Sequence, residues 1–406
     1  MGMNQTPASE RVHISFFGRR NAGKSSVINA ITGQDLAIVS SVKGTTTDPV
    51  YKTMELLPLG PVMIIDTPGI DDEGELGALR VKKSYQVLNK TDIAILIVDS
   101  TTGKTDADYA LISRFIHKKI PYLIVYNKID LLTDQEVYDL AFSTRKEEVM
   151  ISVAANMNIH ELKEKIASMK PEDSHKYPLI GDLINPEDLV ILVVPIDKAA
   201  PKGRLILPQQ QTIRDILEAG AVAVVSRDTE LNETLKNLGK KPKMVITDSQ
   251  AFGYVKNIVP DDILLTSFSI LFARYKGDLD NSIKAVKAID NLKDGDTVLI
   301  AEGCTHHRQC DDIGTVKIPK WLKAHCDKNV NYEFCSGTEF PRDLSKYKAV
   351  IHCGGCTLNE KEMKHRIYVC KEQGVPITNY GIFIAYTQGI LERSIEVFPE
   401  FANKLK

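Results

Sequence analysis

The chain has 406 residues, which at about 150 residues per domain predicts two or three domains. Charged residues make up 26% and hydrophobic residues 43%, which excludes a disordered or fibrous chain. The net charge of -2 gives no sign of the basic surface that binds nucleic acid or anionic membranes. No apolar run reaches about 18 residues and no apolar leader opens the sequence, so we expect a cytoplasmic protein without a membrane span.

The first segment, from Arg11 to about Lys170, alternates between apolar runs and helical stretches. A helix is predicted over Ser26–Ile31, and strands over Val12–Phe17, Val62–Ile65, Ile93–Val98 and Tyr122–Tyr126. Continuous apolar strands separated by helices indicate an α/β domain with a buried, mostly parallel sheet. We place this domain at residues 1–172, before a polar linker with two prolines that ends at Pro178.

A phosphate-binding loop is predicted between the first strand and the first helix. Gly18-Arg-Arg-Asn-Ala-Gly23-Lys24-Ser25 matches the pattern G-x-x-x-x-G-K-[ST] in the context that this motif requires. Its backbone amides and the helix N-terminus attract phosphate, Lys24 neutralises the β- and γ-phosphates, and Ser25 ligates Mg²⁺.

Two further motifs at strand ends indicate that the nucleotide is GTP. Asp66-Thr-Pro-Gly69 offers a carboxylate for Mg²⁺ and an amide near the γ-phosphate. Asn127-Lys-Ile-Asp130 resembles the guanine-recognition motif of translation-factor-like GTPases, in which Asp130 would accept hydrogen bonds from guanine N1 and N2. The residue after Gly69 is Ile70, which cannot orient water, so we expect slow intrinsic hydrolysis.

Finer features of the first domain resemble the Era- and MnmE-like bacterial GTPases. That resemblance implies that Thr46 is the switch threonine, with Thr45 as the alternative in the same threonine run, and that Asn21 binds an activating K⁺ ion. Stabilising the loop turn is the simpler interpretation of Asn21. We expect nucleotide contacts from Asn21, Ala22, Gly23, Lys24, Ser25, Ser26, Thr46, Asp66, Gly69, Asn127, Lys128, Asp130, Ser152 and Val153, with Lys24, Thr46, Asp66 and Gly69 as the catalytic set.

The second segment alternates in the same way but carries few chemically telling residues. An apolar run over Leu189–Ile196, a helix over Gln209–Glu218 and strands over Ala221–Ser226 and Met244–Thr247 are predicted. The glutamines at 209–211 indicate a solvated helix start. We assign residues 177–266 to this second α/β domain.

All seven cysteines lie in the third segment, between Cys304 and Cys370. Strands predicted over Thr297–Ala301, Val330–Phe334 and Ala349–His352 each run into or just before a cysteine. Because ligands of open α/β sheets bind beyond the carboxyl ends of the strands, these strand ends indicate a site. We assign residues 267–406 to a third, smaller α/β domain.

Two Cys/His clusters in this segment have the character of a metal site. Cys304-Thr-His306 and His352-Cys353-Gly-Gly-Cys356 place three thiols and two histidines together, with 45 residues between the histidines. Two cysteines with two histidines, or three with one, suit structural zinc, whereas three thiolates with a loose fourth position suit a [4Fe–4S] cluster. Spacing alone leaves zinc and iron–sulfur open. The other cysteines are predicted to be small buried hydrophobic residues: Cys310, Cys326, Cys335 and Cys370.

A GTPase domain joined to this C-x-H-x(45)-H-C-x-x-C pattern resembles the HydF family of [FeFe]-hydrogenase maturation. The segments Pro195–Gln209 and Ala301–Gly314 are also similar to that family. The resemblance implies a GTPase domain with Mg²⁺ and K⁺, a dimerisation domain, and a C-terminal domain whose [4Fe–4S] cluster carries a di-iron precursor. It implies Cys304, Cys353 and Cys356 as cluster ligands, with His306 or His352 as the fourth. The implied partners are a second copy of the chain or a higher oligomer, radical-SAM maturases and apo-[FeFe]-hydrogenase.

Two alternatives fit the residues. One is a zinc-stabilised Era-like GTPase acting in RNA modification or ribosome assembly, against which the sequence offers no basic patch with interleaved aromatic residues. The other is a GTPase that senses redox state through its thiols. Iron content distinguishes the three hypotheses.

Overall fold

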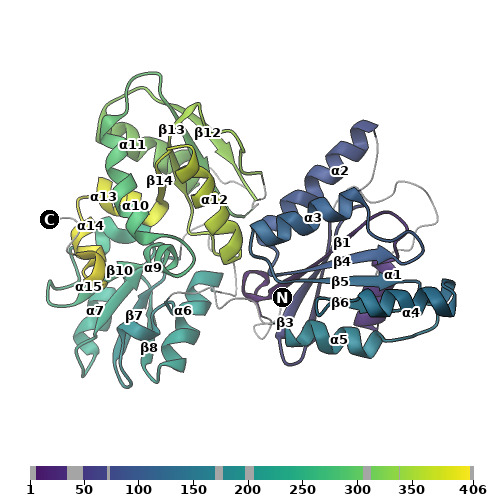
Figure 1. Ribbon diagram of the computed structural model, residues 1–406. Coiled ribbons are helices and arrows are strands. Elements are labelled where there is room, and N and C mark those ends of the chain that lie inside the picture. The colour runs from purple at the N-terminus through teal and green to yellow at the C-terminus, as the bar shows by residue number, and fades with distance from the viewer. Residues whose placement is uncertain are drawn as a thin grey trace. The chain divides into compact units, whose positions relative to one another are not determined.

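The computed structural model describes residues 6–33, 49–70, 74–169, 177–196, 205–304, 312–337 and 339–402. The chain divides into two compact units, residues 1–174 and 175–406 (Figure 1). Thr45, Thr46, the acidic residues at 71–73, His306 and Cys310 lie outside the described residues.

The first unit is built on one six-stranded sheet in the order β2-β3-β1-β4-β5-β6. All neighbouring strands run parallel except β2 and β3, which pair antiparallel at one edge. The strands are β1 (Val12–Gly18), β2 (Val50–Leu56), β3 (Gly60–Asp66), β4 (Ile93–Asp99), β5 (Tyr122–Asn127) and β6 (Glu148–Met150).

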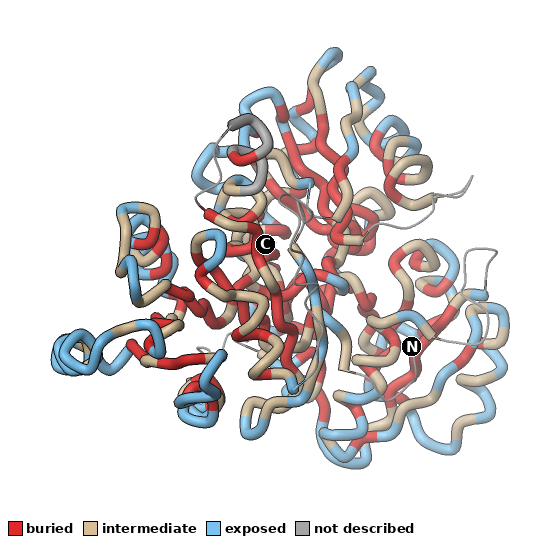
Figure 2. The backbone as a smooth tube through the Cα atoms, turned by 90° about the vertical axis from the view of Figure 1, so that its right-hand side faces the viewer, coloured by how far each residue is buried: buried red, intermediate tan, exposed pale blue. Residues whose placement is uncertain are grey.

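Helices cover both faces of this sheet because its strands are apolar on both sides. Side chains of α1 (Lys24–Thr32) and α5 (Ile159–Ser168) pack on one face. Side chains of α3 (Asp106–His117) and the end of α2 (Gly74–Val87) pack on the other, where α4 (Asp134–Ser143) adds Leu140. The tube in Figure 2 accordingly shows buried strands, with exposed residues on helices and loops.

The second unit contains two four-stranded parallel sheets. The first has the order β10-β9-β7-β8, and the second β12-β11-β13-β14. The strands are β7 (Leu189–Val193), β8 (Val222–Ser226), β9 (Met244–Thr247), β10 (Leu264–Ser267), β11 (Thr297–Ala301), β12 (Asn331–Cys335), β13 (Tyr347–His352) and β14 (Ile377–Asn379). The helices are α6 (Leu207–Glu218), α7 (Leu231–Asn237), α8 (Phe252–Val255), α9 (Phe268–Tyr275), α10 (Leu279–Val286), α11 (Ile318–Cys326), α12 (Glu360–Glu372), α13 (Tyr380–Thr387), α14 (Leu391–Ile395) and α15 (Pro399–Ala402).

One continuous hydrophobic core joins the two sheets of the second unit. It runs from Ile191 of β7 through Phe272 of α9 to Ile300 of β11 and Phe383 of α13. A smaller core lies on the other face of β11 and β13, where α12 packs. The second and third domains expected from the sequence therefore share a core, and the boundary between them at residue 266 remains a prediction.

The α/β fold class with mostly parallel sheets is confirmed. Cys335 and Cys370 are buried in the smaller core, as predicted, whereas Cys326 is half-buried and donates to the Leu322 carbonyl. The prediction that the helix start is solvated is wrong for Gln209. This residue is 3% exposed, and its side-chain oxygen accepts a hydrogen bond from the Ile206 amide.

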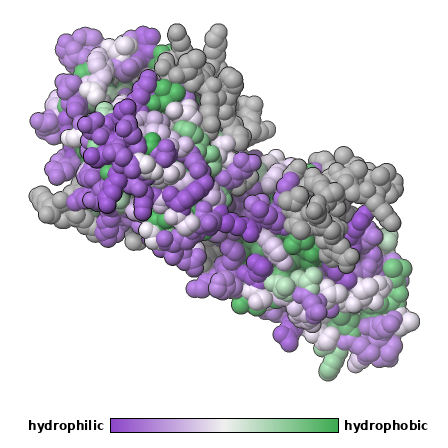
Figure 3. Space-filling view, turned by 90° about the horizontal axis from the view of Figure 1, so that it is seen from above, coloured by the Kyte–Doolittle hydropathy of each residue, from purple (hydrophilic) through white to green (hydrophobic). Residues whose placement is uncertain are grey.

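No helix in the described ranges is both long enough and apolar enough to cross a bilayer. The face in Figure 3 is mostly hydrophilic, with hydrophobic residues in small separate patches.

Candidate functional site

The phosphate loop connects the end of β1 to the start of α1. Gly18, Asn21 and Gly23 have φ angles of 146°, 60° and 92°. A Cβ atom on Gly23 would lie 2.3 Å from Asn127 Nδ2, and one on Gly18 would lie 2.3 Å from the Ile97 carbonyl oxygen. Neighbouring atoms lie too close to Gly18 and Gly23 for any side chain, so the loop requires glycine at both positions. Asn21 also has a positive φ angle, which asparagine tolerates better than most residues.

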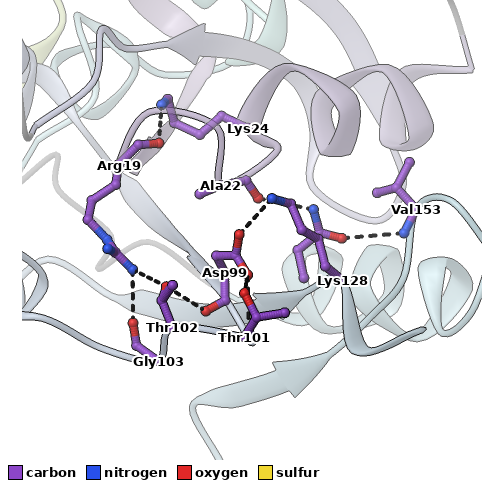
Figure 4. Close-up of polar contacts among 10 residues, drawn as sticks. Arg19, Ala22, Lys24, Asp99, Thr101, Thr102, Gly103, Lys128 and Val153 are labelled. Carbon is purple, nitrogen blue, oxygen red and sulfur yellow. Dashed lines mark hydrogen bonds and ion pairs between the residues drawn. The ribbon is translucent and has the colours of Figure 1, made fainter. Parts of the chain in front are cut away.

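Lys24 closes over this loop. Its ammonium group donates to the Gly18 and Arg19 carbonyls at 3.0 Å each, the second of which is drawn in Figure 4. Lys24 is the first residue of α1, so its charge adds to the positive end of the helix. A loop of backbone amides, a lysine and a helix N-terminus together form an anion site of the kind that holds nucleotide phosphates.

The guanine-recognition residues meet this loop from the ends of neighbouring strands. Asn127 Nδ2 donates to the Ala22 carbonyl at 3.1 Å, and the Val153 amide donates to Asn127 Oδ1 at 3.3 Å (Figure 4). Lys128 pairs with Asp99 at 2.6 Å, and the Ser152 hydroxyl donates to Asp130. The structure therefore brings together both halves of the predicted base site.

The predicted magnesium residues lie on the other side of the loop. The Ser25 hydroxyl donates to Asp66 Oδ2 at 2.9 Å. Asp66 Oδ1 is buried and has no hydrogen-bond partner among the described residues. Burial raises the pKa of Asp66, against the opposing effects of Lys24, Ser25 and Lys52. A hydroxyl and a carboxylate with a vacant oxygen fit the hard-oxygen preference of Mg²⁺.

Ile70 is buried in the core beneath the sheet at 6% exposure. The residue after Gly69 therefore packs inward, and slow intrinsic hydrolysis remains a prediction.

Cys304, Cys335 and Cys353 lie at or just beyond the carboxyl ends of strands in the second sheet of the second unit. β12, β11 and β13 are parallel neighbours, so their carboxyl ends meet at one edge of this sheet. The Cys353 amide donates to the Ala301 carbonyl at 2.9 Å, and Cys353 Sγ accepts from the amides of Gly303 at 3.0 Å and Gly355 at 3.4 Å. The loops after β11 and β13 are thus bound to one another through a thiol.

The three motif thiols affect one another electrostatically. Burial raises the pKa of Cys304 to about 11 and that of Cys353 to about 12, and charge on the neighbouring thiols acts in the same direction. The pKa of Cys356 is also raised by burial, although the ammonium group of Lys276 opposes the rise. Each of the three thiols is therefore harder to deprotonate than a solvent-exposed cysteine.

The thiol set fits an iron–sulfur cluster or zinc by its chemistry, since three cysteines are a common partial ligand set for both. In the part of the chain that the structure describes, no group of three or more cysteine, histidine or acidic side chains is arranged to hold a metal ion. Metal ligation by these thiols remains a prediction. Gly303 and Gly355 pack closely in these loops, because an added Cβ would lie 2.8 Å from Leu358 Cγ and 2.6 Å from Met363 Sδ.

His352 is fully buried, and both of its ring nitrogens have protein partners. Nε2 lies 2.9 Å from Arg366 Nη1, and Nδ1 lies 2.7 Å from the Cys353 carbonyl oxygen. Since arginine only donates, Nε2 accepts and Nδ1 carries the proton. Burial, followed by the charge of Arg366, lowers the pKa of His352 to about 3. Ligation by His352 remains a prediction, and it would require one of these contacts to break.

Sequence reasoning missed three cations around the two sites, of which Arg366 and Lys276 are buried and Arg19 is half-buried. Arg366 is completely buried, bonds to Glu362 Oε1 at 3.1 Å and donates to the Gly337 carbonyl. Lys276 is 1% exposed and donates to the Leu358 carbonyl beside the cysteine loop. Arg19, in the phosphate loop, bonds to Thr102 and pairs with Asp108 at 3.5 Å. Each lies outside the motif positions that carry the predicted roles, so no motif points to it.

Sequence comparison assigns these domains to families. Residues 13–128 match a family described as 50S ribosome-binding GTPase. Residues 179–277 match the hydrogen maturase F dimerization domain, and residues 261–397 match the hydrogen maturase F tetramerization domain. The chain belongs to the HydF family. Its dimerization and tetramerization domains support oligomerisation of this HydF chain.

The individual proteins similar to this chain include other GTPases, each matched over part of the chain. The chain is 32% identical over 157 residues to the tRNA modification GTPase MnmE of Dechloromonas aromatica, and the match covers 38% of this chain and 34% of that protein. It is 33% identical over 164 residues to GTPase Der of Chlamydia abortus, covering 39% and 34%. This HydF chain therefore spans about a third of the length of the curated relatives that it matches.

Among solved structures, Era of Aquifex aeolicus bound to GDP and AlF4- matches at 21% identity with a TM-score of 0.36. The match covers 56% of this chain and 98% of that one.

Proposed function

We propose that this HydF chain is a GTP-driven scaffold that carries a [4Fe–4S] cluster and delivers a di-iron precursor to apo-[FeFe]-hydrogenase. The observation that supports the proposal is that Cys304 follows β11 and that Cys353 and Cys356 follow β13, its parallel neighbour, in a chain with both HydF domains. The match to MnmE covers 38% of this chain and 34% of that protein, so it gives no support to RNA as a substrate of the whole chain.

In the GTPase domain, Lys24 and the loop amides would hold the phosphates, and Asn127, Asp130 and the Val153 amide would hold guanine. Ser25 and Asp66 would hold Mg²⁺, which supplies positive charge that stabilises the transferring phosphoryl group when it is bound. Thr46 would close over the γ-phosphate, and Gly69 would sense it through its amide. Asn21 would bind K⁺, adding positive charge at the phosphates. Hydrolysis would change the loops that contact a partner protein.

In the second unit, Cys304, Cys353 and Cys356 would bind the cluster, with His306 or His352 as a candidate fourth ligand. The cluster would supply an iron site for the precursor. Residues 177–266 would form the dimer, and residues 267–406 would carry the cluster. Radical-SAM maturases would load the scaffold, and the apo-hydrogenase would receive the precursor.

Iron content after anaerobic reconstitution tests this proposal. We expect a brown protein with about four irons per chain, as a [4Fe–4S] cluster requires. Cys353→Ser loses this iron, whereas Cys370→Ser retains it, because Cys370 lies in the hydrophobic core. A colourless protein with one zinc ion per chain would refute the scaffold and favour a zinc-stabilised GTPase. Activation of apo-hydrogenase by the loaded protein, with and without GTP, then tests delivery.

A further inference from the structure

Lys52 lies on the edge strand of the first sheet, close enough to the predicted magnesium ligand Asp66 for its charge to act on that carboxylate. Lys52 lies on β2 and pairs with Ile64 of β3, while Asp66 lies two residues further along β3. Residues two apart on a strand share a face, so Lys52 and Asp66 are diagonal cross-strand neighbours. That face packs against α1, because Met54, Ile64 and Ile28 belong to one core cluster.

The ammonium nitrogen of Lys52 is buried and has no hydrogen-bond partner among the residues that the structure describes. The Oδ1 atom of Asp66 is likewise buried and has no hydrogen-bond partner among the described residues. The two groups form no ion pair within 4.0 Å, yet the charge of Lys52 lowers the pKa of Asp66. A buried ammonium group without a partner is costly, so its presence here calls for a compensating charge.

The groups around Asp66 indicate that Lys52 compensates the charge of its carboxylate. Lys24, the other cation that acts on Asp66, is bonded to two loop carbonyls. Ser25 contributes a neutral hydroxyl. Of the two cations that act on Asp66, Lys52 is therefore the one whose ammonium group has no hydrogen-bond partner among the described residues.

We propose that Lys52 is a built-in counter-cation of the magnesium site. In the Mg²⁺-free protein it balances the Asp66 carboxylate, and Mg²⁺ binds against its charge. This inference rests on the GTP and Mg²⁺ binding proposed above. Lys52 is a positioning residue, which acts on the metal through Asp66. It weakens Mg²⁺ binding and supports the nucleotide complex that forms without Mg²⁺.

The test measures a fluorescent GDP analogue bound to the full chain, first in EDTA and then as Mg²⁺ is added. Lys52→Met removes the charge of a residue whose backbone lies about 7–8 Å from that of Asp66, as for diagonal neighbours. A unit charge repels a divalent ion at that range, so its removal tightens Mg²⁺ binding. We expect the Mg²⁺ concentration at half-saturation to fall about tenfold. GDP binding in EDTA becomes weaker, because no charge then balances the Asp66 carboxylate in the Mg²⁺-free complex. Lys52→Arg, which keeps the charge, behaves like the unaltered protein.

The matched control is Lys146→Met, an exposed lysine that precedes β6 at the opposite edge of the sheet. If Lys52 had only a structural role, Lys52→Met would weaken GDP binding and Mg²⁺ binding together, and this result would overturn the inference. An unchanged Mg²⁺ concentration at half-saturation would overturn it as well. If Lys52→Met does not fold, Lys52→Gln gives the same comparison. Failure of the unaltered protein to bind GDP under any condition would instead refute the GTPase proposal.

Discussion

Replacing Arg366 with methionine tests whether the buried network behind the cysteine loop stabilises the second unit. The guanidinium group is inaccessible to solvent and bonds to His352 Nε2, Glu362 Oε1 and the Gly337 carbonyl, and it lies 5.1 Å from the centre of the Phe340 ring. Methionine fills most of the apolar volume but forms none of these hydrogen bonds.

The expected cost is dominated by Glu362. Its side chain is 10% exposed, so the loss of Arg366 leaves a nearly buried carboxylate without its ion-pair partner. Removing one partner of a buried pair costs about 3–5 kcal/mol. We therefore expect the free energy of unfolding of the second unit to fall by about that amount.

Urea unfolding followed by tryptophan fluorescence measures this change. Trp321 is the single tryptophan of the chain and lies on α11, against the main core of the second unit, so the signal reports this unit alone. The control is Arg342→Met, at an exposed position. The double variant Arg366→Met/Glu362→Gln recovers part of the loss, because the uncompensated carboxylate is gone. A decrease in the free energy of unfolding below about 1 kcal/mol, or equal to that of Arg342→Met, would refute the reasoning. A decrease of that size is typical of ordinary surface substitutions.

Two further predictions concern the phosphate loop. Gly23→Ala places a Cβ 2.3 Å from Asn127 Nδ2 at a φ of 92°. Strain of about 1–3 kcal/mol and a lost hydrogen bond of about 1 kcal/mol lower GDP affinity by about 30-fold or more, measured by fluorescent GDP titration. An affinity within about threefold of the unaltered protein contradicts this interpretation of the glycine. GTP hydrolysis is expected to be faster in K⁺ than in Na⁺, and Asn21→Ala erases the difference. Asn156→Ala, at an exposed left-handed position, retains it, and phosphate release at equal rates in both salts by the unaltered protein would rule out the K⁺ role.

The strands of both units were largely predictable because each is a continuous apolar run between turn signals. Met244–Thr247 and Thr297–Ala301 have the bounds expected from the sequence. The apolar run that begins at Leu189 gives a shorter strand, ending at Val193, because Pro195 cannot donate to a ladder. The GTP motifs meet in space because strand ends of a parallel sheet share one edge.

The buried polar groups could not be predicted. Nothing in the sequence near Lys52 or Arg366 distinguishes either residue from the many exposed lysines and arginines. Gln209 looks like a solvated helix start, but its side-chain oxygen caps the Ile206 amide and its amide nitrogen lies 3.4 Å from Asp248 Oδ2. These roles depend on which loops fold over the side chain, which is a property of tertiary structure. His352 illustrates the same limit, since its motif indicates a ligand while Arg366, 14 residues later, occupies its Nε2.

The continuous core of the second unit has a thermodynamic consequence. Residues of β7 and of β11 belong to one cluster, so the two sheets are expected to lose their packing together. Anything that binds at the cysteine edge of β11 and β13 stabilises the folded unit by mass action, and that stabilisation extends to β7 and β8. The matched dimerization domain contains these two strands. The shared core thus links any binding at the cysteine edge to the stability of the region that matches the dimerization domain.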